Sequence, residues 1–369
     1  MRRPEQLEDF SKNQQKVLKS LRTSRIILPI LIGVGVVLYL LWRQFDPQEF
    51  RKIQWTSYAL FWIGVALLIL VIRHLAYAYR LRLLSEGVFG WRKCIELIFI
   101  WEFSSAVSPT SLGGSAVAFF VLAQEKLSAA KTATIVLYTI VLDTLFFLIT
   151  LPLLYFLFGT GMIRPNLDGV TDLDAWGYYF LLGFFLMLIY GTLFYYGLFK
   201  NPLQLKRVLV GFTKIRFFRK YRRKAIDLGN EIMVASGQLK RQNWKFHSLA
   251  FLATVVAWLF RFLSLNCLII GLLRSVPTDF WSQFEVYGRF ESMFIILAFS
   301  PTPGGAGIIE LLFNNFFNDY VTSATNATVI ATLWRVLTFY SYLLAGVIII
   351  PNWLRKVIEE LRKKRLQKK

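Results

Sequence analysis

The chain has 369 residues, of which 56% are hydrophobic and 17% aromatic, whereas only 18% carry a charge. Soluble proteins contain about 25% charged residues, so this composition excludes a soluble catalytic domain and indicates several helices packed in one membrane domain. The formal net charge is +21, yet lysine and arginine cluster between and beyond the apolar blocks, as in proteins that cross a membrane several times. Nucleic acid is therefore not an expected partner.

Residues 1–25 combine basic side chains with one apolar stripe, which is typical of an amphipathic helix at the membrane surface. The first apolar block, 26–42, predicts a full span, and no small-residue cleavage site follows it, so we expect it to remain as an anchor. A second span is expected from about Trp55 to Tyr79. Arg80, in the basic turn that follows, is expected to extend its charge to the interface.

The third apolar block, 95–107, is too short to cross the membrane comfortably and stops at the sequence SPTSLGG, residues 108–114. After a second short apolar run, residues 132–158 predict a full span. The loop 159–175 has three aspartates against one arginine, and we expect it outside the cell. Residues 26–158 thus form a first membrane repeat.

Residues 176–199 predict another span, and the segment 200–246 is the most basic of the chain, which predicts a cytoplasmic location. A span at 247–273 and a short polar loop at 274–288 follow.

A short apolar run, 289–299, then breaks at the sequence SPTPGGAG, residues 300–307, before a short run and a last span at 327–350. We interpret 176–350 as the second membrane repeat and 351–369 as a basic cytoplasmic tail, so that both termini are cytoplasmic.

The two breaks resemble one another: each has Ser-Pro-Thr followed by a pair of glycines. Asp143 and Arg335 lie equally far downstream of the first and second break, and Arg73 and Arg261 lie in the spans before them. Weak repeats with interrupted helices are typical of transporters. The charge pattern predicts an all-α polytopic membrane protein, an inverted repeat with about six full spans and two re-entrant hairpins that enter from opposite sides.

Irregular backbone persists in hydrocarbon only where protein or water satisfies its polar groups. We therefore expect the two breaks to meet at a polar cavity, with the helices after Gly114 and Gly305 directing their N-terminal ends at an anion such as a lipid phosphate. The predicted substrate-binding residues are Ser108, Pro109, Thr110, Gly113, Gly114, Ser300, Pro301, Thr302, Pro303, Gly304, Gly305, Gly307, Glu310, Arg73, Glu102, Asp143, Arg261 and Arg335.

Charged side chains inside spans cost at least about 2.5–3.5 kcal/mol each, so those of Glu102, Asp143, Arg261 and Arg335 require a reason. One interpretation is a structural ion pair between Asp143 and Arg335. The other is that the arginines hold a phosphate while the carboxylates balance or relay charge. Glu310 has a further interpretation, as a residue that caps its own short helix. The sequence leaves these alternatives open.

Metal and cofactor sites are not expected. Cys94 and Cys267 are predicted to be free apolar side chains, because both lie in or beside apolar blocks. His74 and His247 have no cysteine or histidine at ligand spacing.

The stretch from Ser300 to Glu310 resembles the Pro-x-Pro-Gly-Gly-x-Gly-x-x-Glu stretch of the flippase-like membrane family that includes the transmembrane region of lysylphosphatidylglycerol synthases. Trp334-Arg335 followed by Tyr340 resembles the final span of that family, and the segment 109–122 with Asp143 beyond it resembles another of its blocks. The similarity covers nearly the whole chain. It implies a multi-pass protein of the bacterial cytoplasmic (inner) membrane that moves or binds a phospholipid or a polyprenyl-linked precursor.

The synthases add an aminoacyl-transfer domain after the membrane region, and the present sequence stops at Lys369, so this resemblance implies no such activity. The expected function is translocation of an anionic lipid between leaflets. The alternatives are an intramembrane transferase acting on a lipid-linked substrate, for which no nucleophile elbow, metal-binding helix or phosphate loop is present, and a non-transporting partner of a cell-envelope machine. The sequence leaves a homo-oligomer open.

Overall fold

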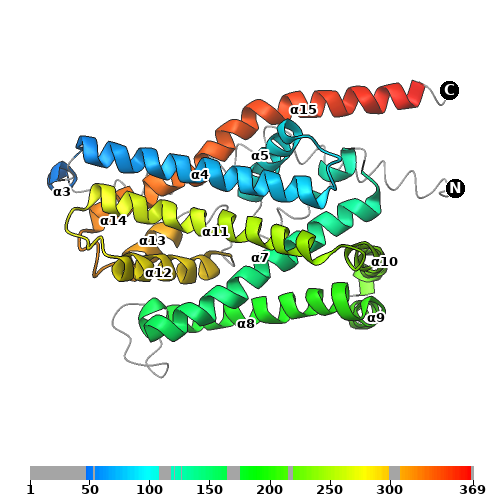
Figure 1. Ribbon diagram of the computed structural model, residues 1–369, viewed down its shortest axis with the longest axis horizontal. Coiled ribbons are helices and arrows are strands. Elements are labelled where there is room, and N and C mark those ends of the chain that lie inside the picture. The colour runs from blue at the N-terminus through cyan, green and yellow to red at the C-terminus, as the bar shows by residue number, and fades with distance from the viewer. Residues whose placement is uncertain are drawn as a thin grey trace.

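A computed structural model describes residues 47–52, 55–107, 118–119, 121–125, 127–163, 175–214, 219–298 and 308–366, which form helices and turns and contain no strand. Figure 1 shows the helices arranged mostly along one long axis. Their bounds are α3 Pro47–Lys52, α4 Ser57–Leu84, α5 Trp91–Val107, α7 Ala129–Phe158, α8 Ala175–Tyr195, α9 Pro202–Phe212, α10 Arg222–Leu239, α11 Trp244–Leu272, α12 Phe280–Ala298, α13 Ile308–Phe316, α14 Ala324–Arg335 and α15 Ser341–Leu366.

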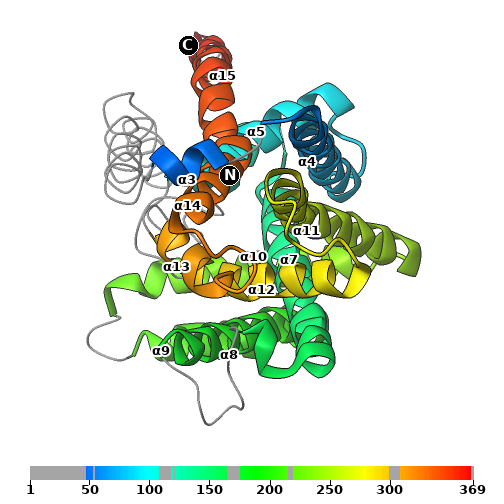
Figure 2. The same cartoon turned by 90° about the vertical axis from the view of Figure 1, so that its left-hand side faces the viewer.

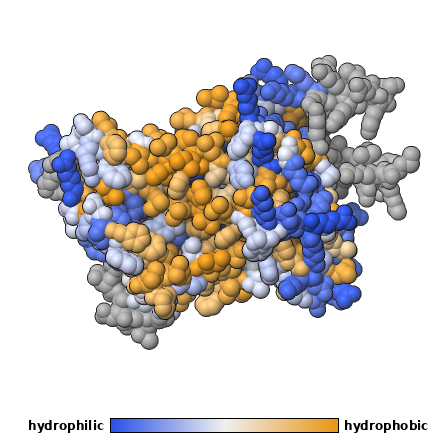
Figure 3. All heavy atoms as spheres, in the orientation of Figure 1, coloured by the Kyte–Doolittle hydropathy of each residue, from blue (hydrophilic) through white to orange (hydrophobic). Residues whose placement is uncertain are grey.

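Within the described residues, five helices are long and apolar enough to cross a membrane: Ser57–Leu84, Ala130–Met162, Ala175–Lys200, Trp244–Leu272 and Ala324–Val357. They confirm five of the predicted full spans. The predicted span 26–42 and the predicted surface helix 1–25 lie outside the described residues. Figure 3 shows the apolar surface as a band across the middle of the molecule, with hydrophilic side chains gathered at its two ends, so the membrane normal follows the long axis.

Helices α4 and α11 pack against each other along much of their length and run in opposite directions. Near the start of α4, the carbonyl oxygen of Ala59 lies against Gly271 near the end of α11. A Cβ at Gly271 would lie 2.7 Å from Cβ of Trp62, so the close approach requires glycine. Near the other end, Arg80 donates a hydrogen bond to Thr254 at 2.9 Å.

Two shorter helices enter the bundle from its opposite ends. A turn of six residues, 85–90, joins α4 to α5, so α5 begins at the end of the molecule where α4 finishes. In the same way, the loop 273–279 joins α11 to α12 at the other end. Viewed along the long axis, Figure 2 shows α15 and α8 at the two outer sides of the bundle.

The predicted polar loop 274–288 is wrong, because α12 already begins at Phe280. Asp279 accepts a hydrogen bond from the backbone N–H of Ser282 at 3.0 Å and so caps this helix. The hydrogen bonds from Ser282 also lower the pKa of the Asp279 carboxyl. An aspartate before an apolar run is a helix-capping signal, but the polar side chains in the first half of α12 led to the prediction of a loop.

The basic segment 200–246 folds into two helices, α9 and α10, rather than an irregular loop. Both appear almost end-on in Figure 1 and therefore run across the long axis. Leu205 of α9 is buried, and a Cβ on Gly197 would lie 2.0 Å from its Cδ2 atom. The predicted tail is likewise helical as far as Leu366, because α15 continues beyond the apolar band.

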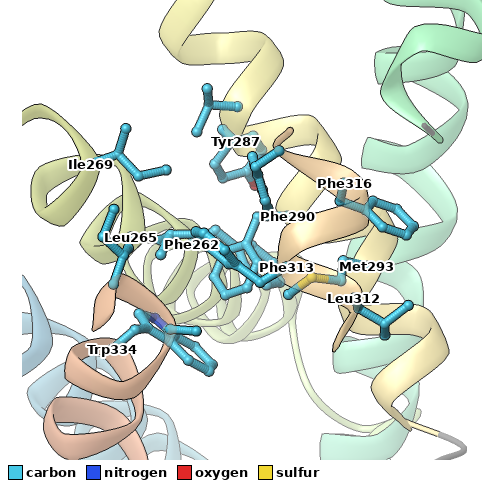
Figure 4. Packing of buried hydrophobic residues seen from close by; sticks show 14 of the residues in the cluster. Phe262, Leu265, Ile269, Tyr287, Phe290, Met293, Leu312, Phe313, Phe316 and Trp334 are labelled. Atoms are coloured by element: carbon cyan, nitrogen blue, oxygen red, sulfur yellow. The ribbon is translucent and has the colours of Figure 1, made fainter. Parts of the chain in front are cut away.

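Buried apolar side chains form two clusters, one of which is built around α11, α12, α13 and α14. Figure 4 shows Phe262, Phe290, Phe313 and Trp334 from these four helices converging. The second cluster involves α4, α5, α7, α10 and α15. Both cysteines are free and buried, as the sequence predicted.

Candidate functional site

The two breaks, which supply most of the predicted site residues, fall outside the described part of the structure. Helix α5 ends at Val107, immediately before the first break, and α13 begins at Ile308, immediately after the second. The following residues, and the Glu310 side chain, therefore lie outside the described part of the structure: Ser108, Pro109, Thr110, Gly113, Gly114, Ser300, Pro301, Thr302, Pro303, Gly304, Gly305 and Gly307. Their predicted roles stay predictions. The structure does describe the charged residues around them.

Arg73, near the middle of α4, connects three helices. Its Nη2 donates to Oε1 of Glu102 on α5 at 2.8 Å, and its Nη1 donates to the hydroxyl of Tyr342 on α15 at 2.9 Å. The Arg73 side chain is 1% exposed and that of Glu102 is 20% exposed. Such partners offset the cost of burying a guanidinium. The structure thus brings two of the predicted residues, Arg73 and Glu102, into one ion pair.

His74 lies next to Arg73 on α4 and contacts the same tyrosine, Tyr342. Its Nδ1 lies 3.1 Å from the hydroxyl of Tyr342, and its Nε2 lies 3.2 Å from the carbonyl oxygen of Ile95. A carbonyl oxygen can only accept, so Nε2 carries a proton. The Tyr342 hydroxyl accepts from Arg73 and has its own proton free to donate to Nδ1. These contacts are compatible with a neutral imidazole whose proton is on Nε2.

A second ion pair joins α4 to α7. Nη1 of Arg80 donates to Oδ1 of Asp143 at 2.5 Å, and Nε1 of Trp258 on α11 donates to the same oxygen at 3.0 Å. The prediction that Arg80 extends to the interface is wrong, because its side chain is only 8% exposed. One interpretation of the sequence paired Asp143 with Arg335. In the structure, Asp143 forms an ion pair with Arg80.

Tyr77 links the two ion pairs. Its ring lies 4.9 Å from the guanidinium carbon of Arg73 and 4.8 Å from that of Arg80. Residues 73, 77 and 80 are four and seven positions apart, so they share one face of α4. This helical spacing was present in the sequence and could have placed Tyr77 and Arg80 at the site, whereas nothing local to Tyr342 indicated its role.

Arg261 of α11 has a different environment. Its guanidinium carbon lies 4.7 Å from the ring centre of Phe294, 5.4 Å from that of Trp258 and 6.0 Å from that of Trp334. Within the described residues no carboxylate oxygen lies within 4.0 Å of it, and its Nε has no hydrogen-bond partner. Arg73 and Glu102 are nevertheless close enough to act on it electrostatically. Arg261 is thus a cation held by aromatic rings beside a matched pair.

Arg335 is fully buried at the end of α14. Its guanidinium lies 5.1 Å from the ring of Phe339 and 5.5 Å from that of Tyr340. The turn Val336–Tyr340 that follows is a π-helix, a distortion that is frequent at functional sites. The site therefore combines α4, α5, α7, α11 and the α14–α15 span.

A further polar cluster, which the sequence analysis missed, lies nearer the end of the molecule where α12 begins. Arg289 of α12 donates to Glu285 at 2.5 Å and to both carboxylate oxygens of Asp319 at 2.6 Å. It also donates to the carbonyl oxygen of Gly161 at 3.0 Å. Arg289 thus ties α12 to the turn after α7 and to the segment after α13, which is a structural role.

The transmembrane-region model of lysylphosphatidylglycerol synthases matches residues 26–346. An archaeal relative, the UPF0104 membrane protein of Archaeoglobus fulgidus, is 24% identical over 298 residues, which is 77% of this chain and 84% of the relative. No solved structure matches. The matched residues include both predicted breaks and every charged residue of the site. The chain belongs to the lysylphosphatidylglycerol synthase TM region family, as its residues 300–310 predicted.

Proposed function

We propose that this membrane protein binds the anionic headgroup of a phospholipid or a lipid-linked precursor within its membrane domain and carries it between the leaflets. The observation that carries the proposal is Arg261. A guanidinium at membrane depth is costly, and an ion pair is the usual compensation. Among the described residues Arg261 has aromatic rings instead, beside the ion pair of Arg73 and Glu102. A phosphate would supply the missing charge-assisted hydrogen bonds.

The second support is the arrangement of the helices that precede the breaks. Helix α5 leads from one end of the molecule towards the break at 108–114, and α12 leads from the opposite end towards the break at 300–307. The preceding helices, α4 and α11, are antiparallel. We propose that the two halves form an inverted repeat and that each break is the tip of a re-entrant hairpin. The two tips would then meet near Arg261.

The membrane orientation belongs to the same proposal. The basic helices α9 and α10 lie at one end of the molecule, and the positive-inside rule assigns that end to the cytoplasm. Helix α15 ends on that side too. We propose the cytoplasmic membrane as the location, with the α12 end facing outward.

Lipid movement is tested by reconstituting the protein with a headgroup-labelled anionic phospholipid in vesicles. The wild type is expected to make inner-leaflet label accessible faster than protein-free vesicles do, and Arg261→Ala is expected to remove at least 90% of that excess, about a tenfold loss for 1.4 kcal/mol of binding. The matched control is Arg274→Ala, because Arg274 is an exposed arginine in the loop after the same helix. An excess equal to zero in the wild type contradicts the proposal, and product formation without movement favours a transferase.

Topology has a separate test in single-cysteine variants made at Ser108 and Ser300 in a background without Cys94 and Cys267. An impermeant thiol reagent is expected to reach the two positions from opposite sides of the membrane. Reaction of both from one side contradicts the inverted repeat, whatever the outcome of the transport assay.

A further inference from the structure

Glu291 of α12 is a fully buried carboxyl group that takes no part in the site described above. It lies eleven residues after the start of α12, about 16 Å along the helix, and therefore well inside the membrane domain. Burying an unpaired carboxylate at this depth is costly. The contacts of Glu291 accordingly determine whether its carboxyl group is more stable protonated or ionised.

The groups around Glu291 supply hydroxyls rather than a cation. From α7, Thr150 makes a hydrogen bond with Oε1, and the hydroxyl of Tyr287, one turn earlier on α12, is a second hydrogen-bonding group for the carboxyl. Oε2 has no hydrogen-bond partner among the described residues. Arg289, two residues away, is bound to Glu285 and Asp319.

The other helices packed against α12 bring no described cation to Glu291. Helix α8 has no charged residue between 176 and 199, and the turn 159–162 after α7 has none. Helix α11 contributes Arg261, which lies on the ring of Phe294. Helix α13 contains one titratable residue, Glu310, an acid whose side chain lies outside the described residues.

The hydrogen bonds of Thr150 are compatible with a protonated Glu291. The hydroxyl oxygen of Thr150 lies 2.9 Å from the carbonyl oxygen of Phe146 and is also hydrogen-bonded to Oε1 of Glu291. A threonine hydroxyl has one hydrogen, and a carbonyl oxygen can only accept. When that hydrogen goes to Phe146, the bond to Glu291 needs its hydrogen from the carboxyl group. Glu291 then donates to Thr150.

Along α12, Glu291 lies between the Arg289 cluster and the residue that contacts Arg261. On one side, the cluster of Arg289, Glu285 and Asp319 connects it with the end of the molecule where α12 begins. On the other, Phe294 comes three residues later and contacts the guanidinium of Arg261. Helix α12 then continues directly into the break at 300–307. A change at Glu291 can therefore move the helix that carries the second hairpin.

We propose that Glu291 is a proton-binding site whose loading and unloading drives the lipid movement proposed above, on which this inference rests. The protonated carboxyl is held in the buried arrangement. Release of the proton to water leaves a carboxylate with no cation beside it among the described residues, which is costly, so α12 shifts to bring water or Arg261 to it. Rebinding a proton from the other side restores the buried arrangement, and one proton crosses in each cycle.

The site itself is tested without transport, by infrared spectroscopy of the purified protein. The wild type is expected to have the carbonyl stretch of a buried protonated carboxylic acid at neutral pH, and Glu291→Gln is expected to remove it. Glu86→Gln is the matched control, because Glu86 is 51% exposed at the end of α4. A wild-type spectrum without this band, or a band that survives in Glu291→Gln, overturns the proposal.

Coupling is tested in vesicles that contain a pH-sensitive dye and the labelled lipid. A pH gradient across the membrane is expected to accelerate lipid movement in the wild type at least tenfold, together with proton entry that depends on the lipid. Glu291→Gln is expected to keep the movement seen without a gradient and to lose the acceleration. An equal response of both proteins overturns the coupling. Absence of lipid movement in the wild type refutes the proposed function and leaves the infrared result to decide whether Glu291 binds a proton.

Discussion

Helices α4 and α11 lie side by side across the membrane domain, yet their arginines have different environments. On α4, Arg73 lies 2.8 Å from Glu102 and Arg80 lies 2.5 Å from Asp143, so each cation has a carboxylate. On α11, Arg261 lies among aromatic rings. Matched charges in a low-dielectric interior hold helices in register, whereas a cation that has only rings around it among the described residues keeps hydrogen-bonding capacity for a ligand. The comparison separates two arginines that have carboxylate partners from one for which we propose a ligand-binding role.

The largest effect is expected on stability, when the ion pair of Arg80 and Asp143 is broken. Asp143→Ala leaves Arg80 as a buried cation without its carboxylate, and breaking such a pair costs about 3–5 kcal/mol of stability. The free energy of unfolding, measured by denaturant titration in detergent, is expected to fall by this amount.

The control for that variant replaces both partners. Arg80→Met combined with Asp143→Leu removes the two charges together, and buried pairs replaced by apolar side chains are often neutral for stability. The double variant is therefore expected to recover most of the loss. If Asp143→Ala is as stable as the wild type, the pair has no structural role and the comparison fails.

A smaller effect of a different kind is expected on α11. Arg261→Ala removes no ion pair among the described residues, so its stability is expected to stay within about 1 kcal/mol of the wild type. Its affinity for an anionic phospholipid is expected to fall about tenfold, which is 1.4 kcal/mol. Native mass spectrometry with an anionic and a zwitterionic lipid measures this. Arg261→Lys keeps the charge, and its affinity is expected to lie between those of the wild type and Arg261→Ala. A stability loss in Arg261→Ala as large as that in Asp143→Ala would show that Arg261 has a structural role.

The last effect concerns stability at α10, outside the membrane spans. Burial, and then the neighbouring Asp227, raise the pKa of Glu231 from 4.5 to about 7. A carboxyl whose pKa is raised by folding contributes its full stability below pH 4.5, and this contribution is lost as the pH rises to about 7. Glu231→Gln is therefore expected to be more stable than the wild type at pH 8, by about 1–2 kcal/mol after allowance for partial exposure, and not at pH 4.5. Thermal unfolding at the two pH values measures the difference, and an equal effect at both excludes the ionisation of Glu231 as its cause.

The predicted spans at 55–79, 132–158, 176–199, 247–273 and 327–350 correspond to helices of the structure because length and hydropathy are local properties. The same properties failed at α12. Its first half carries Gln283 and Glu285, which fall in the predicted loop 274–288, and Arg289, which follows that loop directly. In the structure Arg289 binds Glu285 and Asp319, and Gln283 accepts from Asn266 at 3.0 Å, so the polar side chains stabilise a helix.

The sequence by itself determined that the chain is a helical membrane protein, that Glu102, Asp143, Arg261 and Arg335 lie in apolar stretches, and which family motif precedes α13. These conclusions depend on composition, spacing and motif, which are properties of neighbouring residues. The sequence did not identify Arg80, Arg289 and Glu291 as buried. Only the tertiary structure decided which carboxylate each arginine meets: Asp143 binds Arg80, Arg73 binds Glu102, and Arg261 lies on rings from three helices. Such partners come from helices far apart in the chain, and their choice depends on how the helix faces pack, which no local pattern specifies.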